Sequence, residues 1–145
     1  MGLALSGGGS KGIAHLGVLK ALQEAGIKPD IISGTSAGSM AGAFFSDGAS
    51  PKEILEMFSN KKFSEFGGFS IPSGGIFKTD RFQRFLESNL KARSFEELSI
   101  PLVVVAADLV AGKIANFTEG ELIPAVLASC AVPIVFTPVS IGDGH

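Results

Sequence analysis

A serine between two glycines is the arrangement in this sequence that most directly suggests chemistry. The segment Gly34-Thr35-Ser36-Ala37-Gly38 has the pattern G-x-S-x-G and follows the apolar pair Ile31-Ile32. Small apolar residues come next, which predicts a strand, a sharp turn and a helix whose N–H groups point at the reacting centre. We interpret Ser36 as the nucleophile of an acyl transfer, because a nucleophilic serine must project from such a sharp turn. The turn requires glycine at 34 and 38, where a side chain would collide with the neighbouring strand or helix. A serine that only caps the helix is the alternative.

A second glycine-rich segment, Gly7-Gly8-Gly9-Ser10-Lys11-Gly12, lies between a strand predicted at residues 3–5 and the first predicted helix. Glycines are needed where bare backbone N–H groups must approach an anion closely. One interpretation is therefore an oxyanion loop that stabilises a tetrahedral intermediate. The other is the dinucleotide fingerprint G-x-G-x-x-G, with Asp30 at about the right distance downstream. In that fingerprint the acidic residue follows the second strand, whereas Asp30 precedes it, so we favour the oxyanion loop.

The elements that must position these segments are short strands alternating with helices. Apolar residues at helical spacing predict helices at 13–22, 37–45, 51–58 and 122–128, and a further helix that Thr79 or Asp80 caps and whose apolar face spans 82–90. Apolar runs predict strands at 3–5, 31–32, 102–106, 114–117 and 137–141. This alternation indicates an α/β fold with a largely parallel sheet. No internal repeat or linker is visible, which predicts a single domain over residues 1–145.

Composition excludes several classes of function. Lysine and arginine number 12 against 14 aspartates and glutamates, and tryptophan and tyrosine are absent, so we expect no nucleic-acid binding. One cysteine and two histidines do not supply a zinc site, and we expect neither a metal nor an organic cofactor. The single cysteine and the lack of a visible signal peptide favour the cytoplasm, with association with a membrane as the alternative. Three prolines interrupt the uncharged stretch 122–142, so we interpret it as buried core rather than a membrane span.

Together, the two glycine segments resemble the patatin-like phospholipase family. The block from Leu5 to Gly26 is similar to the family's opening G-G-G-x-[RK]-G segment, and residues 34–38 match its G-x-S-x-G. Residues 107–109 and 128–139 resemble later segments of the family. The resemblance implies a three-layer α/β/α fold and a Ser–Asp dyad that hydrolyses lipid acyl esters. It implies that Ser36 is the nucleophile.

The resemblance also implies roles for the glycines after the first strand. Gly7, Gly8 and Gly9 correspond to the oxyanion loop, and Gly12 closes that motif. A dyad without histidine makes chemical sense, because a carboxylate in a dry site becomes basic enough to accept the serine proton.

The catalytic aspartate is where this sequence departs from the family, which carries it in a D-G-[GA] motif. Asp143-Gly144 is followed by His145, and Asp47-Gly48 comes too early. We therefore expect the aspartate beyond residue 145, in a C-terminal part of the domain that is missing here, with Asp143 as the alternative. His15 is interpreted as a packing or surface residue, although the sequence alone leaves it open as a partner of Ser36.

We therefore predict a serine lipid acyl hydrolase of the phospholipase A or carboxylesterase type. An acyltransferase of related fold, a catalytically inactive lipid-binding module and a nucleotide-binding domain are the alternatives. A glycine-broken loop at 61–76 carries Phe63, Phe66 and Phe69, which either contact acyl chains or a membrane surface or cover the core. Asp108 is interpreted as a turn residue and Cys130 as an inert core thiol.

Overall fold

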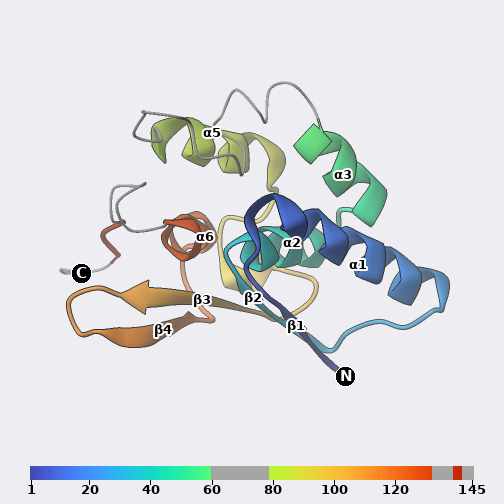
Figure 1. The fold of residues 1–145 in the computed structure, drawn as a ribbon, viewed down its shortest axis with the longest axis horizontal. Helices are drawn as coiled ribbons and strands as arrows, with labels where there is room; N and C mark the ends of the chain where they lie inside the picture. Colours follow the sequence, from blue (N-terminus) through green and yellow to red (C-terminus); the bar gives the residue numbers. More distant parts are fainter. Residues whose placement is uncertain (60–78, 132–138, 142–145) are drawn as a thin grey trace.

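One mixed sheet is the centre of the fold (Figure 1). The computed structural model describes residues 1–59, 79–131 and 139–141. Within them β1 (Gly2–Leu5), β2 (Ile31–Thr35), β3 (Leu102–Asp108) and β4 (Lys113–Phe117) form a sheet in the order β1-β2-β3-β4. The first three strands run parallel, and β4 pairs antiparallel with β3. The predicted α/β fold with a largely parallel sheet is therefore confirmed.

Helices connect the strands, and the predicted ones are confirmed with boundaries shifted by a few residues. The predicted helices are α1 (Ala14–Glu24), α2 (Ala37–Ser46), α3 (Pro51–Ser59), α5 (Thr79–Asn89) and α6 (Leu122–Cys130). The structure adds two short 3-10 helices that were not predicted, η1 (Gly9–Ile13) and η2 (Phe95–Glu97). The strand predicted at 137–141 lies partly outside the described residues, and residues 139–141 belong to no strand. The loop predicted at 61–76 lies outside them entirely.

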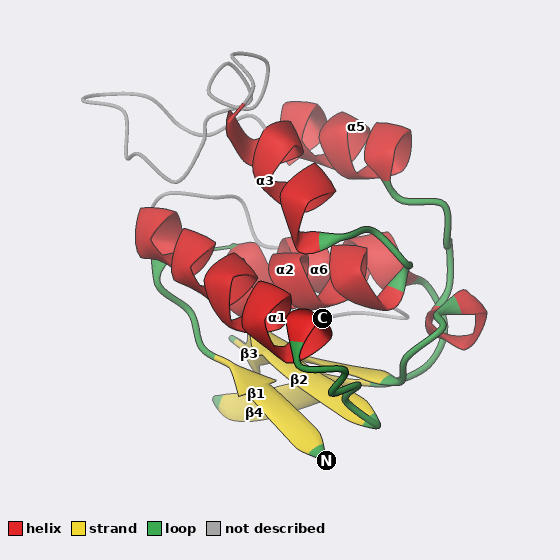
Figure 2. Cartoon of the chain, turned by 90° about the vertical axis from the view of Figure 1, so that its right-hand side faces the viewer, coloured by secondary structure: helices red, strands yellow, loops and turns green. Residues whose placement is uncertain are grey.

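The described helices lie on one face of the sheet. α1, α2 and α6 form the layer next to the strands, and α3 and α5 lie farther out (Figure 1, Figure 2). The topology explains this placement. The strand order steps in one direction from β1 to β3, and right-handed crossovers between such strands put their helices on the same side. The described residues thus form the sheet and one helical face of the α/β/α arrangement.

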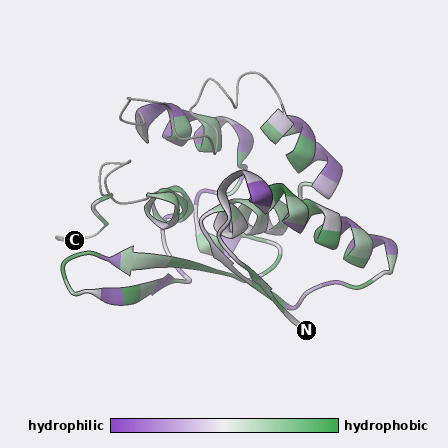
Figure 3. Cartoon of the chain, in the orientation of Figure 1, coloured by the Kyte–Doolittle hydropathy of each residue, from purple (hydrophilic) through white to green (hydrophobic). Residues whose placement is uncertain are grey.

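The core fills the space between this sheet and the helices. Small residues let α2 approach the strands, since a Cβ placed on Gly42 would lie only 3.0 Å from Leu102 Cδ1. Phe44 on α2 packs edge-on against Phe58 of α3 and Phe85 of α5, with ring centroids 5.8 and 6.1 Å away. These contacts join the outer helices to the inner layer. Along the chain, α2 and α6 are coloured mostly apolar, whereas α3 and α5 mix polar and apolar residues (Figure 3).

The uncharged stretch that begins at Leu122 contributes α6 to this core. Leu122 and Val126 are fully buried in it, so residues 122–130 are core, as predicted. None of the helices that the structure describes is long and apolar enough to cross a membrane.

Candidate active site

The two glycine-rich segments meet at one edge of the sheet. Gly7 follows β1 and Ser36 follows β2, and these neighbouring strands run parallel, so their carboxyl ends share an edge. A Cβ placed on Gly7 would lie 3.6 Å from the Cβ of Ser36 and 3.8 Å from the carbonyl oxygen of Thr35. The glycine loop therefore lies directly against the predicted nucleophile.

Ser36 has a strained backbone. Its φ of 52° makes it the one non-glycine residue with positive φ in the described part of the chain, and its ψ is −116°. Residues other than glycine rarely adopt this backbone conformation. It costs about 1–3 kcal/mol and persists only where the surrounding structure holds it. Ser36 lies between the end of β2 and the first residue of α2, which is the strand-to-helix turn that the G-x-S-x-G pattern predicts.

Both backbone polar groups of Ser36 are held by hydrogen bonds. Its N–H donates to the Oγ of Ser129 at 2.8 Å. Its carbonyl oxygen accepts from the Oγ of Ser39 at 2.7 Å and from the N–H of Met40 at 3.1 Å. These bonds fix the main chain of the turn on both sides. The orientation of Ser36 is thus set by the fold, before any substrate binds.

Three motif glycines are required by close packing. A Cβ on Gly38 would lie 2.1 Å from the carbonyl oxygen of Leu5, and one on Gly34 would lie 2.5 Å from the carbonyl oxygen of Gly38. One on Gly12 would lie 2.3 Å from the Cβ of Ala37. Contacts this short force the main chain to shift. The structure thus places a collision at Gly34 and Gly38, as the sequence predicts, and packs η1 against the start of α2.

The glycine loop presents bare backbone beside Ser36. Gly7 and Gly8 are exposed, and no hydrogen bond of the described residues uses the N–H of either one. Gly9 has a φ of 54°, in the left-handed region that favours glycine. Ala37 begins α2, and the first N–H groups of a helix lack partners within it. N–H groups at a loop and at a helix N-terminus can together hold a developing oxyanion.

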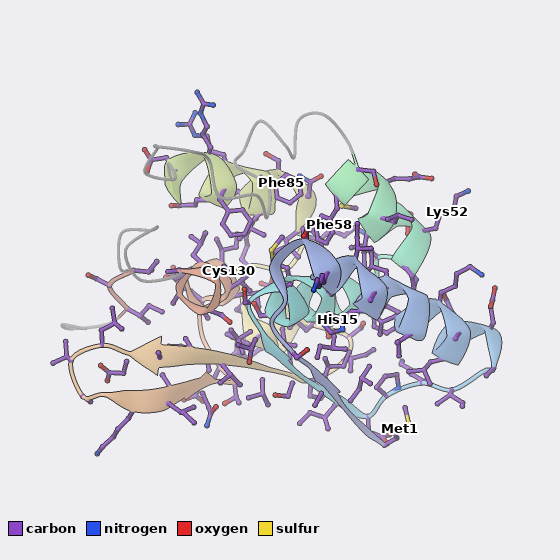
Figure 4. The ribbon with its side chains drawn as sticks, in the orientation of Figure 1. Met1, His15, Lys52, Phe58, Phe85 and Cys130 are labelled. Carbon is purple, nitrogen blue, oxygen red and sulfur yellow. The ribbon has the colours of Figure 1, made fainter. Side chains whose placement is uncertain are left out.

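His15 lies in the first turn of α1, which follows this loop (Figure 4). Its Nε2 is 2.8 Å from the carbonyl oxygen of Ser6. A carbonyl oxygen only accepts hydrogen bonds, so in this contact Nε2 is the donor. His15 therefore braces the residue that precedes the glycine loop, in agreement with the packing role predicted for it.

Asp47 and Asp108 have structural partners. The carboxylate of Asp47 accepts the N–H groups of Lys91 and Ala92 at 2.8 and 3.0 Å, which ties the end of α2 to the end of α5. The Oδ1 of Asp108 accepts two N–H groups of the β3–β4 turn, both at 2.9 Å. Asp108 is thus a turn residue, as predicted. Asp143 lies outside the described residues.

Asp30 lies at the opposite edge of the sheet from the glycine loop. Its N–H donates to the carbonyl oxygen of Met1 at 2.9 Å, which places it beside the amino end of β1. In a dinucleotide-binding fold the acidic residue and the glycine turn lie at the same edge, at the carboxyl ends of the strands. The position of Asp30 therefore argues against the dinucleotide interpretation.

Two neighbouring residues at the end of α6 reach the serine turn. Ser129 accepts the N–H of Ser36. The Sγ of Cys130, which Figure 4 labels on α6, lies 3.9 Å from the Oγ of Ser39. Burial raises the pKa of the Cys130 thiol to about 12, against a smaller opposing effect of hydrogen bonds with Ser39 and Ser36. The thiol therefore stays protonated, as expected of an inert core cysteine.

Sequence analysis did not find the role of Ser129. It is 93 residues from Ser36, and no spacing rule connects the two. The contact exists because α6 packs across β3 and against α2, which brings its last turn to the end of β2. A hydroxyl residue in an otherwise apolar helix was the available signal, and it does not point to a partner.

Comparisons with known proteins agree with this geometry. The family model described as patatin-like phospholipase matches residues 3–145. An uncharacterized NTE family protein of Mycobacterium tuberculosis is 32% identical over 145 residues, which cover 99% of this chain and 40% of that protein. Patatin-like phospholipase domain-containing protein 7 of Rattus norvegicus is 32% identical over 152 residues, covering 99% of this chain and 11% of that protein. The chain thus spans less than half the length of these relatives.

Solved structures show the same fold at lower sequence identity. VipD from Legionella pneumophila matches with a TM-score of 0.64 at 18% identity, over 99% of this chain and 44% of that one. ExoU of Pseudomonas aeruginosa, in its complex with SpcU, matches with a TM-score of 0.56 at 21% identity, over 99% of this chain and 38% of that one.

Proposed function

Because the chain belongs to the patatin-like phospholipase family, we propose that it hydrolyses ester bonds of lipids with Ser36 as the nucleophile. One observation carries the assignment of Ser36. Ser36 has a positive φ, its N–H and its carbonyl oxygen are both hydrogen-bonded, and it lies next to the exposed backbone of Gly7. Backbone strain of this kind clusters at functional sites, and here it falls on a half-buried serine at the carboxyl edge of the sheet.

The reaction uses the parts that meet at this edge. The Oγ of Ser36 attacks the carbonyl carbon of the ester, and a carboxylate accepts the hydroxyl proton. The N–H groups of Gly7, Gly8 and Ala37 hold the oxyanion, and one such donor is worth roughly 3–4 kcal/mol of the barrier. The alcohol then leaves with a proton, and water hydrolyses the acyl-serine to release the fatty acid and regenerate Ser36.

We assign the proton transfer to an aspartate outside the described residues. Asp47 and Asp108 bind backbone N–H groups at the ends of α2 and β3, and His15 is hydrogen-bonded to the carbonyl oxygen of Ser6 rather than to Ser36. Asp143→Asn in the full-length protein tests the one Asp-Gly aspartate of this sequence that follows α6. A hydrolysis rate near that of the wild type would assign the base to an aspartate after residue 145, whereas a loss of about 10⁴-fold would assign it to Asp143.

A fluorophosphonate probe tests the nucleophile. We expect it to label the full-length protein, and we expect the label to be lost in Ser36→Ala while Ser88→Ala on the exposed side of α5 keeps it. No labelling of the wild type would overturn the proposal in favour of an inactive lipid-binding module. Labelling with ester turnover only when an acceptor alcohol is added would favour an acyltransferase.

A lipid surface is the proposed source of the substrate. Leu109 and Val110, at the turn that follows β3, are 58% and 74% exposed, and β3 ends at the same edge as β1 and β2. An exposed apolar turn at the same edge of the sheet as the site supports contact with acyl chains. We expect Leu109→Ser with Val110→Ser to weaken sedimentation with phosphatidylcholine vesicles, whereas Val18→Ser on α1 should not. Equal sedimentation of both variants would argue against contact through this turn.

A further inference from the structure

At the end of the β2–β3 ladder, a side chain takes part in place of a direct bond between the two main chains. We call each N–H to carbonyl position of this ladder a rung. Near the start of this parallel pair, the N–H of Ile32 donates to the carbonyl oxygen of Pro101 at 2.9 Å. In a parallel ladder this bond recurs at every second residue of each strand. The same register, four residues farther along, would join the N–H of Ser36 directly to the carbonyl oxygen of Val105.

A side chain from α6 occupies that rung instead. The N–H of Ser36 donates to the Oγ of Ser129 at 2.8 Å, and the Oγ of Ser129 donates to the carbonyl oxygen of Val105 at 2.6 Å. A hydroxyl group accepts and donates at once, so neither backbone group loses its partner. The chain leaves the ladder at this point, and Ser36 takes its positive φ there.

We propose that Ser129 is a positioning residue that keeps Ser36 out of the β2–β3 ladder and in its strained turn. The inference rests on the proposed function, because the turn matters only if Ser36 is the nucleophile. Without the hydroxyl group, the N–H of Ser36 and the carbonyl oxygen of Val105 are free to bond to each other. That bond would extend the ladder by one rung, relieve the positive φ and move the Oγ of Ser36 away from Gly7.

The position of Ser129 is itself well defined. It lies in the last turn of α6, a helix that packs on β3 and α2 and whose Leu122 and Val126 are fully buried. Its neighbour Cys130 is buried beside Ser39, which in turn donates to the carbonyl oxygen of Ser36. The end of α6 therefore contacts the serine turn at two consecutive residues. A rigid helix thus holds the hydroxyl group at the rung.

Ser129→Ala in the full-length protein tests the proposal. We expect kcat and the rate of fluorophosphonate labelling to fall about a hundredfold, because a displacement of the nucleophile by about 1 Å has an effect of this size. KM should change less than about twofold, since the loss concerns the reacting atom rather than substrate binding. Ser129→Thr, which keeps a hydroxyl group, should restore most of the rate.

Ser99→Ala is the matched control. The Oγ of Ser99 donates to the carbonyl oxygen of Ser46 at 2.6 Å, so this variant also removes a partly buried hydroxyl–carbonyl bond. We expect its melting temperature to fall at least as much as that of Ser129→Ala, with the labelling rate unchanged. Labelling of Ser129→Ala at the wild-type rate, or equal slowing in Ser99→Ala, would overturn the positioning role.

A crystal structure of Ser129→Ala separates this inference from the proposed function. We expect a negative φ at Ser36 and a direct bond from its N–H to the carbonyl oxygen of Val105. A turn that keeps its positive φ without the hydroxyl group would contradict the inference, whatever the activity. Failure of the wild-type protein to react with the probe would count against the proposed function alone.

Discussion

Two glycine segments surround Ser36, and they differ in what an added side chain would meet. At Gly34 and Gly38, which are buried, a Cβ would lie 2.5 and 2.1 Å from backbone atoms. At Gly7 and Gly8, which are exposed, the nearest atom would be 3.6 Å away, an ordinary contact distance. The turn around Ser36 thus needs glycine for packing, whereas the loop after β1 has space for a side chain.

The difference teaches that glycine motifs at one site can report two separate requirements. In the turn, a missing side chain allows β1 and α2 to touch. In the loop, it leaves the N–H groups of Gly7 and Gly8 accessible. Gly12 belongs to the loop in the sequence, but like Gly34 and Gly38 it is required by packing, since a Cβ there would lie 2.3 Å from the Cβ of Ala37. Stability and activity measurements should therefore separate the two classes.

Gly38→Ala should have the largest effect, and on folding. The new Cβ would collide with the carbonyl oxygen of Leu5. This oxygen is a main-chain atom of β1, so it cannot move aside as the end of a flexible side chain can. We expect a loss of about 3 kcal/mol or more in the free energy of unfolding, measured by urea denaturation. A loss below about 1 kcal/mol would show that the turn is less tightly packed than the structure has it.

Gly7→Ala should affect activity instead. Its Cβ fits without a clash but fills the space beside the Cβ of Ser36, where the oxyanion must approach. We expect kcat to fall about 10²- to 10³-fold, as when an oxyanion donor is lost, with the free energy of unfolding within about 0.5 kcal/mol of the wild type. Parallel losses of activity and stability would show that the two segments have the same requirement.

Cys130, which is buried beside the serine turn, should make the stability of the fold depend on pH. Its pKa is raised from 9.0 to about 12, so the protonated thiol stabilises the fold below pH 9, and this contribution is lost as the pH rises toward 12. The slope is at most about 1.4 kcal/mol per pH unit. Thermal unfolding between pH 8 and 11 should show a steeper decline for the wild type than for Cys130→Ala. Equal slopes would mean that water reaches the thiol.

Gly17→Ala is the smallest prediction and the control for both classes. This glycine lies in α1 and is exposed, and a Cβ placed on it would have no atom within 4 Å, so it meets neither requirement. Alanine is the better helix former by about 0.5–1 kcal/mol. We expect the free energy of unfolding to rise by this amount, measured by urea denaturation, with activity unchanged. A destabilised variant would contradict the open surroundings of Gly17.

The local pattern predicted much of this site because its parts are close in sequence. Gly34 to Gly38 form one turn, and the strand before Ser36 and the helix after it follow from apolar spacing. The loop from Gly7 to Gly12 could be placed beside Ser36 because consecutive parallel strands end at the same edge. The family resemblance supplied the chemistry.

Residues that join distant elements could not be predicted in the same way. Ser129 reaches Ser36 only because α6 packs across β3, and the sequence contains no register for that packing. The distinction between Gly12 and Gly7 also depends on which element lies opposite each one. Asp30 is the opposite case, since its position before the second strand already argued against the fingerprint, and the sheet places it beside the amino end of β1 accordingly.

By itself, the sequence determined the types and order of the elements, the nucleophilic serine as a candidate and the need for bare backbone around it. These follow from local rules on apolar period, turn residues and side-chain size. Only the tertiary structure decided that the glycines fall into two classes and that the hydroxyl group of Ser129 replaces a rung of the ladder. The physical reason is that contact distances and hydrogen-bond partners between distant segments depend on how the helices pack on the sheet.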